Sequence, residues 1–169
     1  MIGIAATNFF RFALLIFLQL FVLNNIQFSG FVNPYLYVLA ILLLPFEISG
    51  WLLLVLAFAL GLVIDTASAT IGYHTAATVF MAYFRFHLLR FIAPRDGYES
   101  GMSPTIQSLG ISWYVKYAPI LTLAHHAALF WLESFRFGDL LQATLRALAS
   151  AVFTVFLIFI YQFFVTKRK

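Results

Sequence analysis

The last apolar run of the chain constrains its fold most. It extends from Ala147 to Val165, 19 residues of which only Ser150, Thr154 and Gln162 are polar. A helix of this length rises about 28 Å, at roughly 1.5 Å per residue, and crosses the hydrocarbon core of a bilayer. Only 9% of the 169 residues are charged and 63% are hydrophobic, too few charges to cover a water-facing surface. The sequence predicts an integral membrane protein without a soluble domain.

Further apolar segments precede this run, separated by prolines and short polar turns. Pro34 favours the start of a helix, and Pro45 ends the same segment after a short run. We expect an all-α membrane protein with one transmembrane domain over residues 1–169, built as a six-transmembrane-helix bundle. The expected helices cover about 7–24, 34–44, 51–65, 73–91, 114–133 and 140–165.

The basic residues predict the orientation of this bundle. With six spans, the side that holds both chain ends receives eight of the ten basic residues, and the other side receives Arg136 and Arg146. The positive-inside rule then places both termini in the cytoplasm. Five spans would put the basic tail Lys167–Lys169 outside, which the rule disfavours.

Ionisable residues inside apolar helices are functional candidates, because an ionised group is costly in lipid. Asp65 ends the apolar run Gly61–Asp65. It is expected either to bind a cation or substrate, or to cap a neighbouring helix and pair with Arg146. Arg85 and Arg90 are expected at the cytoplasmic end of their helix, with their stems reaching toward the headgroups.

Two histidines precede an acid on the fifth expected helix. His126 and Glu133 are seven residues apart and share a helix face, whereas His125 is rotated from them by about 100°. This arrangement differs from the zinc-hydrolase pattern, in which two histidines four residues apart flank a glutamate. Polar contacts between packed helices are therefore expected here in preference to a metal site.

Several classes of chemistry have no sequence signal. There is no cysteine, which excludes disulfides and thiolate chemistry. We find no serine nucleophile motif, phosphate loop, haem motif or carboxylate pair, and no basic face of the kind that binds nucleic acid. The sequence predicts neither an enzyme nor a nucleic-acid-binding protein.

Three short motifs resemble a known family. Asn33-Pro34-Tyr35 opens the second expected helix, Gly61-Leu62-Val63-Ile64-Asp65 ends the third, and Gly72-Tyr73-His74-Thr75-Ala76 opens the fourth. These motifs resemble the bacterial rod shape-determining protein MreD family. In that family one helix ends in Gly-Leu-x-x-Asp and a Gly-x-His-like segment opens the next.

The resemblance implies a non-enzymatic scaffold of the cell-wall elongation machinery in the bacterial inner (cytoplasmic) membrane. It implies binding to the single-span protein MreC, in a complex with the actin-like MreB, the glycosyltransferase RodA and the elongation transpeptidase. It also implies a fold similar to the substrate-binding subunits of energy-coupling factor transporters.

No catalytic residue, cofactor or metal carries over from this resemblance. The residues that match its motifs are candidates for a partner-binding or bundle-forming site: Gly61, Asp65, Gly72 and His74. The candidate intramembrane polar residues are His125, His126 and Glu133.

Two other functions are compatible with the same residues. A membrane subunit that binds a small molecule for uptake would need polar groups facing the outer side, which four residues supply: Asp65, His74, His126 and Glu133. An intramembrane metal enzyme would use His125, His126 and Glu133. The polar stretch 65–72 is expected either as a surface loop or as irregular backbone inside the bundle.

Overall fold

The computed structural model describes residues 2–25, 31–134 and 139–166, and for 2–5 and 165–166 the backbone alone. Every regular element in these ranges is helical, so the all-α prediction is confirmed for them. The α-helices are α1 (Ile2–Phe21), α2 (Leu39–Leu42), α3 (Gly50–Ser68), α4 (Tyr73–Phe91), α5 (Ile106–Leu109), α6 (Ile111–Ser134) and α7 (Leu140–Thr166). The 3-10 helices are η1 (Leu23–Asn25) and η2 (Leu36–Val38).

Three stretches of these helices are long and apolar enough to cross a membrane: Ala6–Asn25, Gly50–Ser68 and Leu140–Phe164. Helices α4 and α6 have 19 and 24 residues. They are less apolar, because each buries histidine and other polar side chains inside the molecule. The buried polar side chains of α4 and α6 face other parts of the protein and not the lipid.

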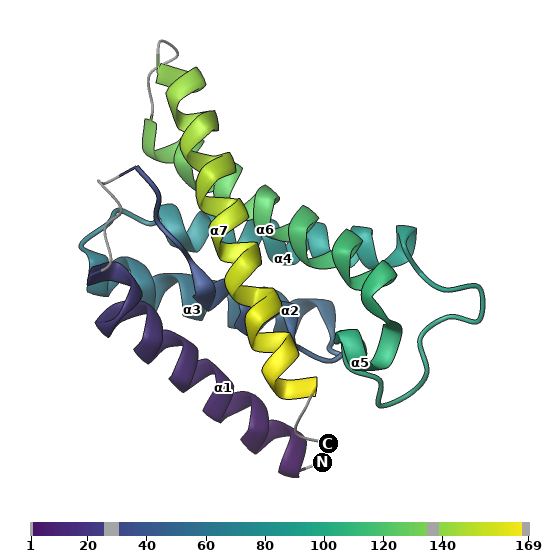
Figure 1. Ribbon diagram of the computed structural model, residues 1–169. Coiled ribbons are helices and arrows are strands. Elements are labelled where there is room, and N and C mark those ends of the chain that lie inside the picture. The colour runs from purple at the N-terminus through teal and green to yellow at the C-terminus, as the bar shows by residue number, and fades with distance from the viewer. Residues whose placement is uncertain (1, 26–30, 135–138, 167–169) are drawn as a thin grey trace.

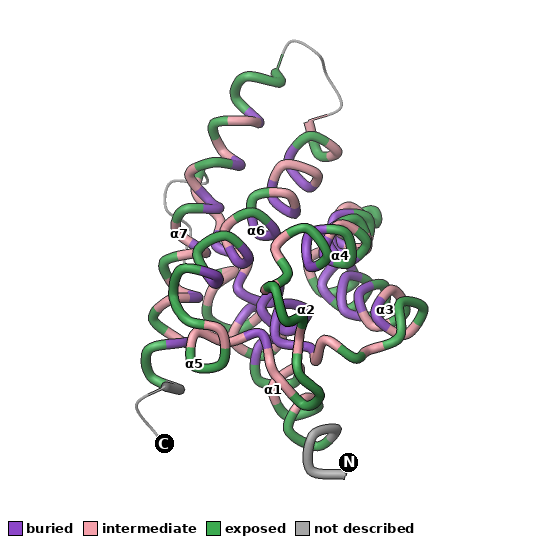
Figure 2. The backbone as a smooth tube through the Cα atoms, turned by 90° about the vertical axis from the view of Figure 1, so that its right-hand side faces the viewer, coloured by how far each residue is buried: buried purple, intermediate pink, exposed green. Residues whose placement is uncertain are grey.

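The helix expected over residues 34–44 is shorter in the structure and begins as a 3-10 helix. No helix forms over residues 33–35, and η2 and the four-residue helix α2 follow. Figure 2 shows α2 in the middle of the molecule, with the long helices around it. The side chains of Tyr37–Leu44 are at most 2% exposed. We call residues 31–44 the central segment.

The chain passes alternately between two ends of the molecule (Figure 1). The proximal end holds the start of α1, the loop between α4 and α5, and the end of α7. The distal end holds the turn between α3 and α4 and the end of α6. The central segment makes a full passage despite its short helix, because extended backbone rises about 3.3 Å per residue against about 1.5 Å in a helix. Arg136 and Lys167–Lys169, used above to orient the chain, lie outside the described residues.

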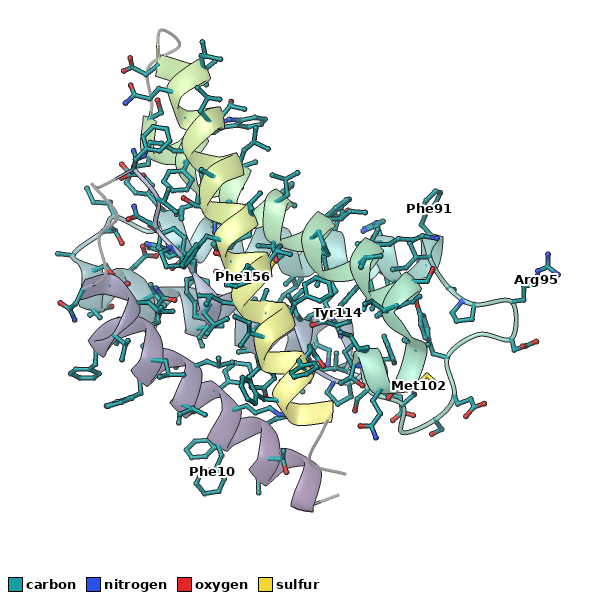
Figure 3. The ribbon with its side chains drawn as sticks, in the orientation of Figure 1. Phe10, Phe91, Arg95, Met102, Tyr114 and Phe156 are labelled. Carbon is teal, nitrogen blue, oxygen red and sulfur yellow. The ribbon has the colours of Figure 1, made fainter. Side chains whose placement is uncertain are left out.

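The outer surface of the molecule is apolar. Figure 3 shows Phe10 and Phe91 pointing outward, and they are 71% and 88% exposed. Tyr114 is fully buried, and its hydroxyl accepts a hydrogen bond from the Gln162 amide at 3.0 Å. Polar groups inside and apolar groups outside are the arrangement that a lipid environment favours.

Helices α3 and α4 pack closely at Gly61. A Cβ atom added there would lie 2.4 Å from the Cα atom of Thr75 and 2.9 Å from the carbonyl oxygen of His74. Only glycine therefore permits this approach of the two backbones. Gly72 is needed for a different reason, since it precedes α4 with a left-handed φ of 76°.

The loop between α4 and α5 is fixed to the proximal end by aromatic packing and one carboxylate. Tyr98 stacks on Phe46, with ring centroids 4.1 Å apart. Glu47 accepts hydrogen bonds from the Ser100 hydroxyl at 2.6 Å and from the Gly101 N–H at 2.9 Å. These bonds, chiefly the one from Ser100, lower the pKa of the Glu47 carboxyl.

The substitution Gly61→Ala is expected to destabilise the protein by about 1–3 kcal/mol, because the methyl group must push α3 and α4 apart. Thermal unfolding in mild detergent measures this loss. Gly50→Ala is the matched control, since it lies in the same helix with no atom within 4 Å of the added Cβ. Equal destabilisation by both substitutions would contradict the close packing.

The Glu47 contacts predict a pH dependence of the loop. Because the folded-state pKa is lowered, the stabilisation is present above the unfolded-state pKa and is lost as the pH falls through the folded value. Exchange of the Gly101 amide proton should therefore accelerate beyond its intrinsic pH dependence as the pH falls below about 4.5. Glu47→Gln should abolish this extra acceleration, whereas Glu99→Gln, an exposed neighbour, should preserve it.

Candidate functional site

The central segment lacks the backbone hydrogen bonds of a long helix, and side chains of the surrounding helices replace them. On α7, the Ser150 Oγ atom accepts the N–H of Asn33 at 3.0 Å. One turn further, the Thr154 Oγ1 atom accepts the N–H of Tyr35 at 3.1 Å. Ser150 and Thr154, two polar residues within the last apolar run, thus hold the extended part of the central segment.

Helix α1 contributes one side chain to the same task. The Gln19 amide is fully buried, donates to the carbonyl oxygen of Pro34 at 3.0 Å and accepts the N–H of Tyr37 at 3.3 Å. It also donates to the Asn24 side chain at 2.9 Å. A single glutamine therefore pairs two backbone groups that would otherwise be buried without partners.

Arg85 and Tyr117 hold the other end of the central segment. The Arg85 guanidinium donates to the carbonyl oxygen of Leu44 at 2.5 Å and to the Tyr117 hydroxyl at 2.7 Å. The same hydroxyl donates to the carbonyl oxygen of Leu42 at 2.8 Å. Within the described ranges, no carboxylate lies at ion-pair distance from Arg85.

The expectation that Arg85 reaches the headgroups is therefore wrong. Arg85 is only 1% exposed. Its guanidinium points into the bundle, where the carbonyl oxygen of Leu44 and the hydroxyl oxygen of Tyr117 accept its hydrogen bonds. Arg90 is exposed, and its guanidinium lies 4.1 Å from the centroid of the Phe86 ring.

Tyr37 connects two histidines that are 51 residues apart in the chain. Its hydroxyl lies 3.0 Å from Nδ1 of His74 and 2.7 Å from Nε2 of His125. His125 and Tyr37 are fully buried, and His74 is 5% exposed. The Tyr37 hydroxyl thus joins α4 to α6 through the central segment, a contact between residues too far apart in the chain for local spacing to indicate.

The three candidates on α6 have separate partners. His126 faces α7, with Nε2 3.1 Å from the Thr154 Oγ1 atom. Glu133 lies 3.9 Å from Arg146, and His125 contacts Tyr37. Among the described residues, no group of three or more histidine, aspartate or glutamate side chains is placed to hold a metal ion. The structure does not bring together the ligand set of the metal-enzyme alternative.

Asp65 caps the start of α4. Its Oδ2 atom accepts the N–H and the hydroxyl of Thr75 at 2.8 and 2.6 Å, and its Oδ1 atom accepts the N–H of His74 at 3.1 Å. Thr70 adds a hydrogen bond from its hydroxyl at 2.5 Å. The capping role considered above is thus present, but Arg146 pairs with Glu133 instead of Asp65.

The stretch 65–72 combines the end of a helix with a surface turn. Helix α3 continues to Ser68, and Ala69 then adopts a left-handed φ of 53°. Ile71 is 86% exposed, so the turn lies at the surface and is not irregular backbone inside the bundle. The Asp65 carboxylate holds this turn by accepting the hydrogen bond from the Thr70 hydroxyl.

A cleft of about 390 Å³ opens at the distal end between η1, the central segment, the turn from α3 to α4, and helices α4 and α6. Its lining consists of Leu23, Asn24, Asn33, Pro34, Tyr35, Ser68, Thr70, Tyr73, His74, Leu129 and Glu133. Of the four residues expected to form a pocket for uptake, His74 and Glu133 line it. Asp65 and His126 lie outside it, since the first caps α4 and the second faces α7.

Comparisons with protein-family models, with curated proteins and with solved structures give no significant match for this chain.

The substitution Asp65→Ala is expected to destabilise the protein by about 2 kcal/mol, because it removes the cap of α4 and leaves buried donors unpaired. Chemical or thermal unfolding of the purified protein tests this value. Asp96→Ala removes the same charge from an exposed loop position and should change stability by less than about 0.5 kcal/mol. A negligible effect of Asp65→Ala would show that the cap contributes nothing.

Proposed function

We propose that this protein is a non-enzymatic membrane scaffold of the bacterial cell-wall elongation machinery that binds MreC and helps to maintain rod shape. One observation carries the proposal. The residues that match the MreD-like motif form one unit at the junction of α3 and α4, where Gly61 permits the helix contact and Asp65 caps the next helix. The spacing of the motif therefore has a physical reason in this chain.

The use of the interior polar residues supports a scaffold. Gln19, Ser150, Thr154, Arg85 and Tyr117 all bind the backbone of the central segment. Side chains committed to such contacts hold a fixed shape, which suits a protein that presents surfaces to partners. We assign the chain six passages of the inner membrane, with the central segment as the second.

The orientation follows from the positive-inside rule. The proximal end presents Arg90, Arg95 and Lys116, all exposed, and in this proposal it faces the cytoplasm with both termini. That end would meet MreB or anionic lipid. Exposed phenylalanines of α1, such as Phe9 and Phe10, offer an apolar face to a transmembrane helix of MreC or to lipid. RodA and the elongation transpeptidase would join through the same complex.

Purification of a tagged copy from native membranes in mild detergent tests the scaffold function. We expect a stoichiometric single-span partner with a large outer domain. Exchanging Arg95 and Lys116 for glutamine should weaken association with MreB while preserving that partner, because both charges lie at the proximal end. Recovery of an ATPase module with a bound small molecule, and of no single-span partner, would overturn the proposal.

A second candidate function is that of a substrate-binding membrane subunit for small-molecule uptake. The distal cleft favours it, since a polar cavity of about 390 Å³ lies within the range of small-molecule sites. The same purification separates the two functions by what remains bound.

A further inference from the structure

Arg11 differs from Arg85 in how its guanidinium is bonded. Arg85 is 1% exposed, and two oxygens inside the bundle accept its hydrogen bonds. Arg11 is half-buried and lies within the apolar stretch Ala6–Asn25. Among the described side chains, its guanidinium donates only to the Oδ1 atom of Asn8, at 3.5 Å. A guanidinium has five N–H donors, so most of those of Arg11 are available to a partner outside the chain.

The charge of Arg11 also has no counterion on an acidic side chain. All six acidic residues belong to the described part of the chain, and the ion pair found there joins Glu133 to Arg146. None of the six carboxylates therefore neutralises Arg11. Because an ionised group is costly in lipid, an anion from outside the chain is the complementary partner.

The position of Arg11 along α1 indicates where this anion lies. Helix α1 starts at the proximal end of the molecule (Figure 1). From Ala6, where the apolar stretch begins, the helix rises about 3 Å to Asn8 and about 8 Å to Arg11, at roughly 1.5 Å per residue. The bond to Asn8 turns the guanidinium back toward the helix start. The charge therefore lies close to the level at which the hydrocarbon ends and the lipid headgroups begin.

Asn8 adds a second donor at the same place. Because a guanidinium only donates, the amide oxygen of Asn8 must face it, and the Nδ2 amino group points elsewhere. Among the described residues this amino group has no hydrogen-bond partner. Asn8 and Arg11 are three residues apart and share a helix face. Together they present positive charge and several donors, which suits an anion with several oxygens.

We propose that Arg11 and Asn8 bind the phosphate of a phospholipid in the leaflet at the proximal end. A guanidinium binds phosphate oxygens in pairs, and phosphates lie at this level of a bilayer. Leu14 and Leu18 continue the Arg11 side of the helix and offer a surface to the acyl chains. An anionic lipid is preferred over a zwitterionic one, since its phosphate has no ammonium group of its own beside it.

This inference requires only that α1 lies in a membrane with its start at the headgroups. The leaflet is the cytoplasmic one in the orientation proposed above, and that detail rests on the proposed function. The purification from native membranes identifies a protein partner, whereas the present site is tested by its lipid. Failure of either proposal therefore leaves the other intact.

Binding of phosphatidylglycerol to the purified, delipidated protein in mild detergent tests the site, with native mass spectrometry as the readout. We expect one tightly held phosphatidylglycerol, weaker binding of phosphatidylcholine, and no comparable binding of diacylglycerol with the same chains. Arg11→Gln should weaken phosphatidylglycerol binding at least about tenfold, because it removes a charge-assisted pair. Arg95→Gln makes the same change at an exposed loop position and should leave this binding unchanged.

A second variant keeps the test decisive should Arg11→Gln impair folding. Asn8→Asp places a carboxylate three residues from Arg11, a spacing at which opposite charges stabilise a helix. This carboxylate replaces the phosphate as counterion, so phosphatidylglycerol binding should fall as it does in Arg11→Gln. Equal binding of diacylglycerol, or unchanged phosphatidylglycerol binding in folded Arg11→Gln or Asn8→Asp, would overturn the proposal.

Solid-state NMR tests the contact itself. Arginine labelled with ¹³C at Cζ is compared in the natural protein and in Arg11→Gln, both in phosphatidylglycerol nanodiscs, and the difference signal belongs to Arg11. We expect the ³¹P nuclei of the lipid to dephase this signal. A difference signal without dephasing would overturn the proposal. Loss of a copurifying protein from Arg11→Gln would then identify a partner's carboxylate as the counterion.

Discussion

The whole architecture depends on pairing the backbone of one short segment in apolar surroundings. Lipid supplies no hydrogen bonds, so a buried N–H or C=O group without a protein partner costs several kcal/mol, of the order given by transfer from water. Residues 31–44 do not form a long helix, and yet they occupy the middle of the bundle. Side chains from α1, α4, α6 and α7 supply hydrogen-bond partners for its backbone groups. The positions of polar residues within otherwise apolar helices follow from this requirement.

The polar groups at the distal end are less completely paired. Around the central segment, amides, hydroxyls and the Arg85 guanidinium have protein partners at 2.5 to 3.3 Å. In the distal cleft, Glu133 has its cation only at 3.9 Å and His74 uses one ring nitrogen. The molecule thus separates polar residues that hold its shape from polar residues that remain open to a ligand. The Tyr37 hydroxyl joins the two groups, since it contacts His74 at the cleft and His125 inside.

The features that the sequence predicted well depend on local patterns. The expected bounds of α4 match Tyr73–Phe91, because Gly72 and the polar stretch before it mark the start of an apolar run. The capping role of Asp65 was also predictable, because the His74 N–H that its carboxylate accepts lies only nine residues further along the chain. Close packing at Gly61 follows the general use of glycine at helix contacts.

The features that the sequence did not predict depend on distant contacts. Pro34 and Pro45 were interpreted as the limits of a helix, but the backbone between them is bonded by side chains as many as 119 residues away. Arg85 carries the same signal as any arginine near a helix end, and only its contact with Leu44 distinguishes it. The cleft joins residues from four separate parts of the chain, a combination that no local spacing reveals.

The separation of these contacts along the chain also bears on the order of biogenesis. Asn33 and Tyr35 are synthesised 117 and 119 residues before Ser150 and Thr154, which accept their N–H groups. During translation these two N–H groups therefore lack their partners on α7 until that helix has been made. Insertion machinery or bound water must shield these groups until α7 arrives. Completion of the fold consequently requires α7, and a chain released before α7 would lack these two hydrogen bonds.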